Sequence, residues 1–439
     1  MLDLGGLRSE PLLATLKGLA ARAVGQPLAA LGSLGLSMLN GDLPFPVAVL
    51  KESALAHNIE WMRAFVQRAG VELCPHGKTT MAPQLFDRQL RAGAWGITAA
   101  TASHLRTYRK FGVQRVILAN QLIDRANIDL VFDELDADPA FDFYCLVDSL
   151  EGLQRLQQRL QQRLQERPLA RPLQVLLEAG STAGRTGVRS FEQGQALGRA
   201  LRDAAPQIAL RGIEAFEGVF GGSDHAGIEL SVLAMLDTVA RLASTGLDEQ
   251  WFAPGEVILT AGGSAFFDLV TQVLDAARDR SNVRVVLRSG CYLTHDVLGY
   301  ERMHERMRQR SPRIYGAGAG LRGALEVWSV VQSVPEPQRA ICALGKRDVS
   351  YDLELPRLLH WFRPGQHTSP QLMTQKNLRV VALNDQHAYV DSIKGDIALQ
   401  VGDLVGFGPS HPCTTFDKWP LLYAVDDRYG VVGGIRTFF

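Results

Sequence analysis

The sequence predicts an α/β protein in which a (β/α)8 barrel is followed by a mainly β domain. Three observations lead to this fold class. The chain has 439 residues, which is too long for one small core. From about residue 45 to 300, short β-rich runs alternate with longer helical stretches. Beyond about residue 315, short apolar runs are separated by turn residues, with no long helical period between them.

The barrel prediction depends on the number and spacing of strand-like runs. These runs are 46–50, 96–100, 114–119, 141–147, 173–178, 210–214, 257–260 and 283–287. Eight such runs within about 250 residues match the size and rhythm of a barrel, and a doubly wound open sheet is the alternative.

Helices are expected between these runs, for example over 53–69 and 150–165. The second of these carries Leu150, Leu153, Leu156, Leu160 and Leu164. Steps of three and four place these leucines on one helical stripe. A coiled-coil seam would need more heptads, so a helix that faces the core is favoured.

The second domain is predicted from a series of short strands. They are 327–332, 339–344, 378–383, 387–391, 403–407, 421–425 and 431–435. We therefore divide the chain into a helical N-terminal extension (1–43), the barrel (44–310) and the β domain (311–439). The extension is interpreted as an amphipathic helix that packs on the body or on a partner subunit. Asp3 and Glu10 stand where a secretory signal needs positive charge.

Composition excludes several classes of protein. Lys+Arg and Asp+Glu are both 46, so a basic face for nucleic acid is not expected. No run of about 18 apolar residues predicts a membrane span. The five cysteines are scattered and lack CxxC spacing, which argues against a disulfide framework. We expect a reducing compartment, the cytoplasm.

Two motifs in the predicted barrel can carry chemistry. Lys78 lies within 74–80, directly after a strand, where barrels place their catalytic groups. A lysine there can form a Schiff base if its surroundings lower its pKa, and the alternative is a surface lysine in a loop. Arg185 lies in the glycine-rich segment 178–187, which is either the lining of a ligand pocket or a plain connecting loop.

Two further motifs are candidates for anion and metal binding. Gly262-Gly263-Ser264 follows a predicted strand, and such a turn either binds phosphate through its backbone amides or is a plain turn. Tyr292, after the next strand, can add a hydroxyl to the same anion. His411 and Cys413 are two residues apart and can chelate zinc with open positions left over. The alternative is a buried cysteine beside an exposed histidine.

In order and spacing, these motifs resemble the D-serine dehydratase and D-threonine aldolase group of fold-type III pyridoxal-phosphate (PLP) enzymes, which are related to alanine racemase. The resemblance runs from about residue 44 to the C-terminus. The segments that carry it are 75–79, 92–96, 184–187, 262–264, 290–292, 345–350, 385–387 and 409–413.

The resemblance implies a PLP-binding barrel with a β domain, and a homodimer in which the β domain of one subunit closes the active site of the other. It implies that Lys78 carries PLP and acts as the base at Cα. The implied cofactor contacts are His76, Arg185, Gly262, Gly263, Ser264 and Tyr292. His411 and Cys413 are implied to hold a divalent metal, zinc or manganese, on the β-hydroxyl of a D-amino acid substrate.

Two positions depart from the group. Thr80 stands where many members have a histidine, and Phe216 stands where a tyrosine is expected. Both substitutions bear on substrate choice or proton transfer.

The predicted function is a dehydratase that converts a D-β-hydroxy amino acid, such as D-serine or D-threonine, to a 2-oxo acid and ammonia. The pair His411 and Cys413 resembles the His-x-Cys metal-binding pair of the group's dehydratases, whereas the corresponding pair in its aldolases is His-x-Asp. Cys413 therefore favours the dehydratase. The alternatives are an aldolase that gives glycine and an aldehyde, a racemase, and a non-catalytic PLP carrier. A racemase would need a second base opposite the lysine, and carriers are typically smaller single barrels.

Overall fold

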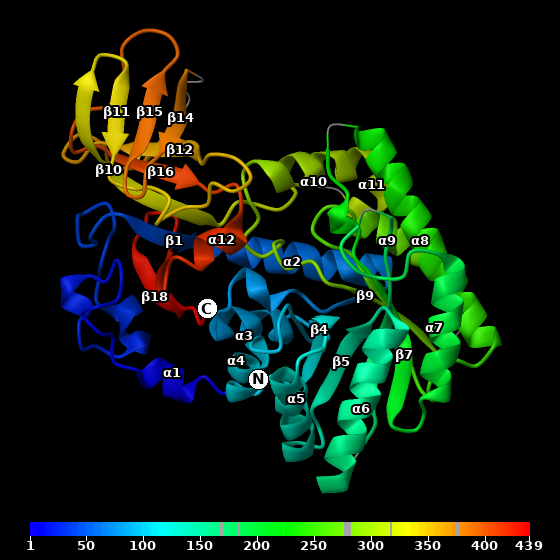
Figure 1. Ribbon diagram of the computed structural model, residues 1–439. Helices are drawn as coiled ribbons and strands as arrows, with labels where there is room; N and C mark the ends of the chain where they lie inside the picture. The colour runs from blue at the N-terminus through cyan, green and yellow to red at the C-terminus, as the bar shows by residue number, and fades with distance from the viewer. Residues whose placement is uncertain (167–170, 183, 223, 276–281, 317, 374–376) are drawn as a thin grey trace.

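The computed structural model divides into two sheets, one parallel and one largely antiparallel (Figure 1). It describes residues 1–166, 171–182, 184–222, 224–275, 282–316, 318–373 and 377–439. The predicted fold class, a parallel α/β barrel with a mainly β second domain, is confirmed.

Eight parallel strands form the barrel, in the order β2-β9-β8-β7-β6-β5-β4-β3. They are β2 (Glu72–Leu73), β3 (Ile97–Ala99), β4 (Arg115–Gln121), β5 (Asp142–Val147), β6 (Leu173–Ala179), β7 (Ile208–Ala215), β8 (Val257–Ala261) and β9 (Val283–Leu287). The two ends of this sheet meet where His76 bridges Thr98 and where the Trp95 amide donates to the Leu73 carbonyl at 2.7 Å. The sheet is therefore closed, and the carboxyl ends of its strands share one rim.

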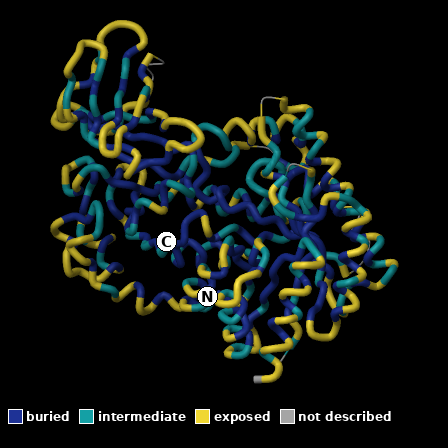
Figure 2. Tube along the Cα trace, in the orientation of Figure 1, coloured by how far each residue is buried: buried dark blue, intermediate teal, exposed yellow. Residues whose placement is uncertain are grey.

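Helices cover the outside of the barrel, and its strands are largely buried beneath them (Figure 2). The helices are α2 (Glu52–Ala69), α3 (Pro83–Arg91), α4 (His104–Lys110), α5 (Arg125–Ala137), α6 (Leu150–Glu166), α7 (Phe191–Asp203), α8 (His225–Asp248) and α9 (Phe267–Asp275). In α6, Leu153, Leu156 and Leu160 are buried, which confirms the prediction of a core-facing stripe. Leu150 and Leu164, at the two ends of the stripe, are exposed.

The second sheet has ten strands, and one of them comes from the N-terminal side of the barrel. Its strands are β1 (Val47–Lys51), β10 (Leu325–Glu336), β11 (Arg339–Cys342), β12 (Arg357–Phe362), β13 (Gln371–Leu372), β14 (Leu378–Leu383), β15 (Ala388–Ser392), β16 (Leu404–Gly408), β17 (Leu421–Val425) and β18 (Val431–Arg436). β1 pairs antiparallel with β10 and parallel with β17. Counting 46–50 among the barrel strands was therefore wrong, and the two-residue β2 takes that place.

The connection between the sheets and the end of the β domain add short helices. α10 (Gly299–Arg310) and α11 (Pro312–Tyr315) lie between the sheets in sequence, and α12 (Pro412–Phe416) lies between β16 and β17. No helix in the described part of the chain is long and apolar enough to cross a membrane.

The N-terminal extension is not one amphipathic helix, so that prediction was wrong. It consists of α1 (Gly5–Ser9) and two 3-10 turns, Ala21–Ala23 and Leu28–Ser33. Prolines lack the amide that a continuous helix needs, and glycines with positive φ, such as Gly18, turn the chain. Most of its leucines are nevertheless buried, although Leu13 is exposed: Leu28 and Leu31 pack on β18, where Gly434 leaves room for their side chains.

Candidate active site at the rim of the barrel

Lys78 lies at the carboxyl end of β2, within a 3-10 turn over Gly77–Thr79. Its side chain is exposed, while Gly77 and Thr79 on either side are buried. A side chain at Gly77 would collide with Tyr108 and Ile97, so the turn packs tightly on the barrel wall. Close packing of the turn therefore fixes the backbone of Lys78 and leaves its amine free at the rim.

Two histidines near Lys78 are held neutral. Burial, followed by the positive charges of Lys78 and Arg288, holds the pKa of His76 well below its usual value. Burial and then Lys78 also lower the pKa of His104. The Nδ1 atom of His76 is buried and has no hydrogen-bond partner among the described residues, which leaves one polar atom at this site to be satisfied by a ligand.

The turn after β8 donates its amides to a buried carboxylate. The amides of Gly262 and Gly263 donate to Glu217 at 3.1 and 2.5 Å. Gly262 has a φ of +90°, a conformation that favours glycine. The Ser289 hydroxyl donates to the carbonyls of Gly262 and Gly263 at 2.8 and 3.0 Å, which fixes the opposite side of the turn. The turn therefore binds an anion, and that anion is the Glu217 side chain, whose pKa is raised by burial.

A buried ion pair lies beneath this turn. Arg288 pairs with Glu214, and both side chains are almost fully buried. The guanidinium also donates to the Thr260 hydroxyl at 3.1 Å and the Ala215 carbonyl at 3.0 Å. Burial raises the pKa of Glu214 to about 8, although Arg288 opposes this shift. The pair forms a rigid, polar support that joins β7, β8 and the end of β9.

Arg185 packs over the ring of Phe216, one of the two departures from the group, with its guanidinium 5.0 Å from the ring centroid. Next to it, Glu178 accepts from Thr186 at 2.6 Å and also accepts from Gln121. Burial raises the pKa of Glu178. These contacts bring the loops after β6 and β7 to the same rim as Lys78.

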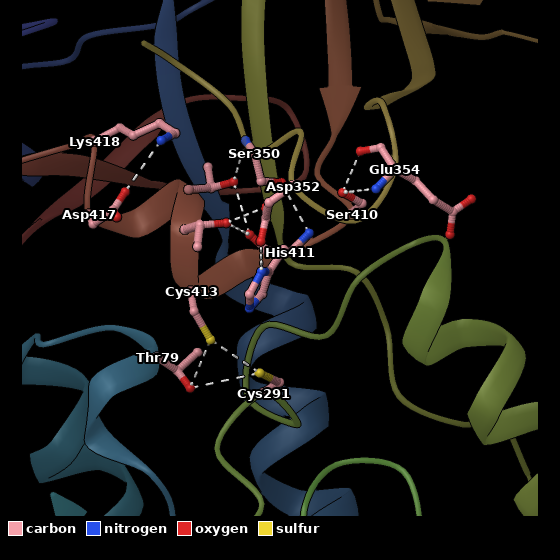
Figure 3. Close-up of polar contacts among 12 residues, drawn as sticks. Thr79, Cys291, Ser350, Asp352, Glu354, Ser410, His411, Cys413, Asp417 and Lys418 are labelled. Atoms are coloured by element: carbon pink, nitrogen blue, oxygen red, sulfur yellow. Dashed lines mark hydrogen bonds and ion pairs between the residues drawn. The ribbon is translucent and has the colours of Figure 1, made fainter. Parts of the chain in front are cut away.

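The β domain brings His411 and Cys413 to this rim through α12 (Figure 3). The Cys413 thiol donates to the hydroxyl of Thr79 at 3.5 Å, and Thr79 directly follows Lys78 in the sequence. His411 Nδ1 lies 2.5 Å from Asp352 Oδ2, and Thr414 donates to the other oxygen of the same carboxylate at 2.8 Å. Burial raises the pKa of Asp352, but its hydrogen bonds with His411 and Thr414 outweigh burial and lower the pKa overall.

Cys291 completes this cluster from the barrel side. Its sulfur lies 3.5 Å from that of Cys413 and 3.8 Å from the Thr79 hydroxyl (Figure 3). Hydrogen bonding with Cys413 lowers the pKa of the Cys291 thiol to about 6 and raises that of Cys413. Both halves of the candidate site therefore come from one chain.

The donor set at His411 and Cys413 fits a divalent metal in type. An imidazole and a thiolate suit zinc, and a carboxylate on Nδ1 leaves Nε2 as the nitrogen for a metal. Within the described ranges, no three His, Cys, Asp or Glu side chains are grouped so that they could hold a metal ion. A metal would therefore have two protein ligands here and would take its remaining ligands from water or substrate.

Not every predicted site residue has a hydrogen bond to another predicted site residue. The hydroxyl of Tyr292 accepts from Gln89 at 3.2 Å, so its predicted contact with phosphate stays a prediction. Thr80 is buried beside Lys78. Glu217, Arg288, Cys291 and Asp352 had no predicted role, although Cys291 lies within the segment 290–292 and Glu217 directly follows Phe216.

Comparison with known proteins identifies a matching family model and a sequence relative. A family model described as "Putative serine dehydratase domain" matches residues 324–425. A D-threonine aldolase of Arthrobacter sp. is 26% identical over 398 residues, which cover 89% of this chain and 90% of the relative.

Two solved structures share the fold. D-threonine aldolase from Filomicrobium marinum gives a TM-score of 0.71 at 18% identity, covering 92% of this chain and 96% of its own. D-threo-3-hydroxyaspartate dehydratase from Delftia sp. HT23 gives 0.66 at 19% identity, covering 92% and 99%. The resemblance of the chain to the D-serine dehydratase and D-threonine aldolase group is thus supported by its sequence and by its fold.

Proposed function

We propose that this relative of the D-threonine aldolases is a PLP- and metal-dependent dehydratase that converts a D-β-hydroxy amino acid to a 2-oxo acid and ammonia. One observation carries the proposal: α12 brings a thiol of the β domain to within 3.5 Å of Thr79, the neighbour of Lys78. A group that activates the β-hydroxyl must lie near a lysine that acts at Cα, because the two carbons are bonded to each other, and the contact with the residue next to Lys78 supports such an arrangement.

Lys78 is the residue that would carry PLP, and the Gly262-Gly263-Ser264 turn would bind its phosphate. The two amides of this turn can bind an anion, because they already donate to the Glu217 carboxylate, and a phosphate would bind them in place of Glu217. Tyr292, His76 and Arg185 would contact the remainder of the cofactor. Bound PLP supplies an electron sink for negative charge at Cα.

In this proposal the chain's own residues divide the chemistry. The Lys78 amine removes the Cα proton, and its exposed position gives it access to substrate. His411 and Cys413 would hold a metal, which would make the β-hydroxyl a better leaving group. Asp352 orients the His411 ring through the Nδ1 contact. The hydroxyl leaves as water. Addition of one water molecule to the dehydrated product then releases its nitrogen as ammonia and yields the 2-oxo acid.

An aldolase is the second candidate, because the Arthrobacter relative carries that name. Cys413 favours the dehydratase, since the group's dehydratases have His-x-Cys. One solved structure of a D-threo-3-hydroxyaspartate dehydratase is a cysteine-to-alanine variant in the metal-free form. We also propose that two copies of the chain form a homodimer.

Product analysis after incubation of the PLP- and zinc-loaded protein with D-threonine tests the proposal. We expect 2-oxobutyrate and ammonia, lost when a chelator removes the metal and regained when zinc is returned. Glycine and acetaldehyde would instead identify an aldolase. L-threonine serves as the control for configuration, and full turnover of a metal-free protein would refute the role of His411 and Cys413.

A further inference from the structure

Cys291 and Cys413 form a thiol pair that joins the two domains. Cys291 follows β9 at the rim of the barrel, and Cys413 lies in α12 of the β domain. Their sulfurs are 3.5 Å apart, although 122 residues separate them in sequence. Figure 3 shows the two side chains pointing toward each other, with Thr79 beside both.

The remaining cysteines lie in different surroundings. All five are free, and Cys74, Cys145 and Cys342 are buried. Cys74 is hydrogen-bonded to Thr98, and no sulfur–sulfur contact involves these three among the described residues. Cys413 is only half-buried, so it is the thiol of the pair that solvent reaches more easily. Accessibility and a second thiol in contact are the two conditions for reversible thiol oxidation.

We propose that Cys291 and Cys413 are an oxidative modification site, which hydrogen peroxide converts to an intramolecular disulfide. The two thiols lose two electrons and two protons, peroxide accepts them, and two water molecules form as the S–S bond closes. A disulfide bond is about 2.05 Å long, so the sulfurs must approach by about 1.5 Å. Rotation of the two side chains or a small shift of the five-residue α12 supplies this movement.

The disulfide would have two consequences. It would tie the rim of the barrel to the β domain at the candidate site. It would also withdraw the Cys413 sulfur from a metal. This second consequence rests on the proposed function, whereas formation of the disulfide does not depend on it. Reduction by a thiol would restore both side chains.

Peptide mapping of the full-length protein tests the modification. The reduced protein is treated with hydrogen peroxide, its remaining thiols are alkylated after denaturation, and the digest is analysed without reductant. We expect one linked peptide pair that contains Cys291 and Cys413 and has lost two hydrogen atoms. Cys342→Ala, which removes a buried thiol of the same domain, should give the same linked pair.

Cys291→Ser supplies the discriminating comparison. Without the second thiol, Cys413 should be oxidised to sulfinic acid, which dithiothreitol does not reverse. Recovery of D-β-hydroxy amino acid turnover after dithiothreitol, expressed as a fraction of each protein's turnover before oxidation, should therefore be largely lost in Cys291→Ser and retained in the protein that keeps Cys291. If Cys413 is oxidised in the protein that keeps Cys291, but no linked peptide pair forms, the proposal is overturned. A linked pair that leaves turnover unchanged would support the modification site and refute the metal-binding role of Cys413.

Discussion

Replacing Asp352 should weaken metal binding although Asp352 is not itself proposed as a ligand. Its carboxylate lies 2.5 Å from His411 Nδ1 and accepts from Thr414 at 2.8 Å. A hydrogen bond to a charged group contributes about 1.5–3 kcal/mol, and 1.4 kcal/mol corresponds to tenfold in affinity. The side chain is 42% exposed, so solvent screening favours the lower end of this range.

We therefore expect Asp352→Ala to reduce zinc affinity about tenfold, because alanine removes the hydrogen-bond acceptor, and Asp352→Asn to reduce it less, because the amide oxygen keeps one acceptor. Competition between the metal-free protein and a fluorescent zinc chelator at constant neutral pH measures both constants. Asp417→Asn is the matched control, since Asp417 ends α12 and pairs only loosely with Lys418 at 3.6 Å. Unchanged zinc affinity in both Asp352 variants would refute the inference that His411 binds metal through Nε2.

Three further predictions concern the cofactor site and the core. Lys78→Ala should abolish the yellow, borohydride-reducible chromophore of the PLP-loaded protein, and a retained chromophore would place the cofactor elsewhere. Glu217→Ala leaves two amides of the Gly262 turn without their acceptor, which should lower the free energy of unfolding by about 2–5 kcal/mol in urea titrations. Inorganic phosphate or PLP should restore more stability to this variant than to the unmodified protein, and equal effects would argue against an anion site. Burial holds the pKa of His295 at about 4, below the ordinary 6.5, so the folded state binds this proton less readily than the unfolded chain. Stability present above pH 6.5 should therefore fall toward pH 4 by at most about 1.4 kcal/mol per pH unit from this group. His295→Asn, which tolerates the φ of +48° at this position, should show a flatter pH profile.

The parts of the fold that were predictable are those that local pattern specifies. The β-rich runs from β3 to β9 alternate with helices, and the leucine stripe of α6 buries Leu153 and Leu156 as its period requires. Partner choice is different, because an apolar run such as Val47–Lys51 is compatible with either sheet. Only its long-range pairing with β10 and β17 decides where it lies. β2 was not predicted as a separate strand because two residues carry no periodicity.

The candidate site shows a similar division. The Gly262 turn was predicted because it directly follows a predicted strand, where barrels place functional groups, and Lys78 was predicted from its place in the segment 74–80. Cys291 and Glu217 were not, because each acquires its meaning from a partner distant in sequence. Glu217 contacts a turn 45 residues away, and Cys291 contacts a thiol 122 residues away. The spacing of residues along the sequence does not predict contacts between such distant positions.

The distance between Lys78 and α12 depends on how the two domains are joined. The chain passes from β1 in the β domain directly into α2 of the barrel. On α2, the fully buried Asn58 side chain donates to the Leu293 carbonyl at 2.9 Å and the Arg322 carbonyl at 2.8 Å. It also accepts from the Arg322 amide at 2.8 Å.

These three bonds tie the loop that carries Cys291 and Tyr292 to the segment that enters β10. A buried side-chain amide with all its partners resists displacement, because each lost bond leaves an unsatisfied polar group. The β domain is thereby held against the barrel independently of any contact made by Cys413. The proposed chemistry at Cα and at the β-hydroxyl would require such a fixed separation, since the lysine and the metal ligands would act on adjacent carbons of one substrate.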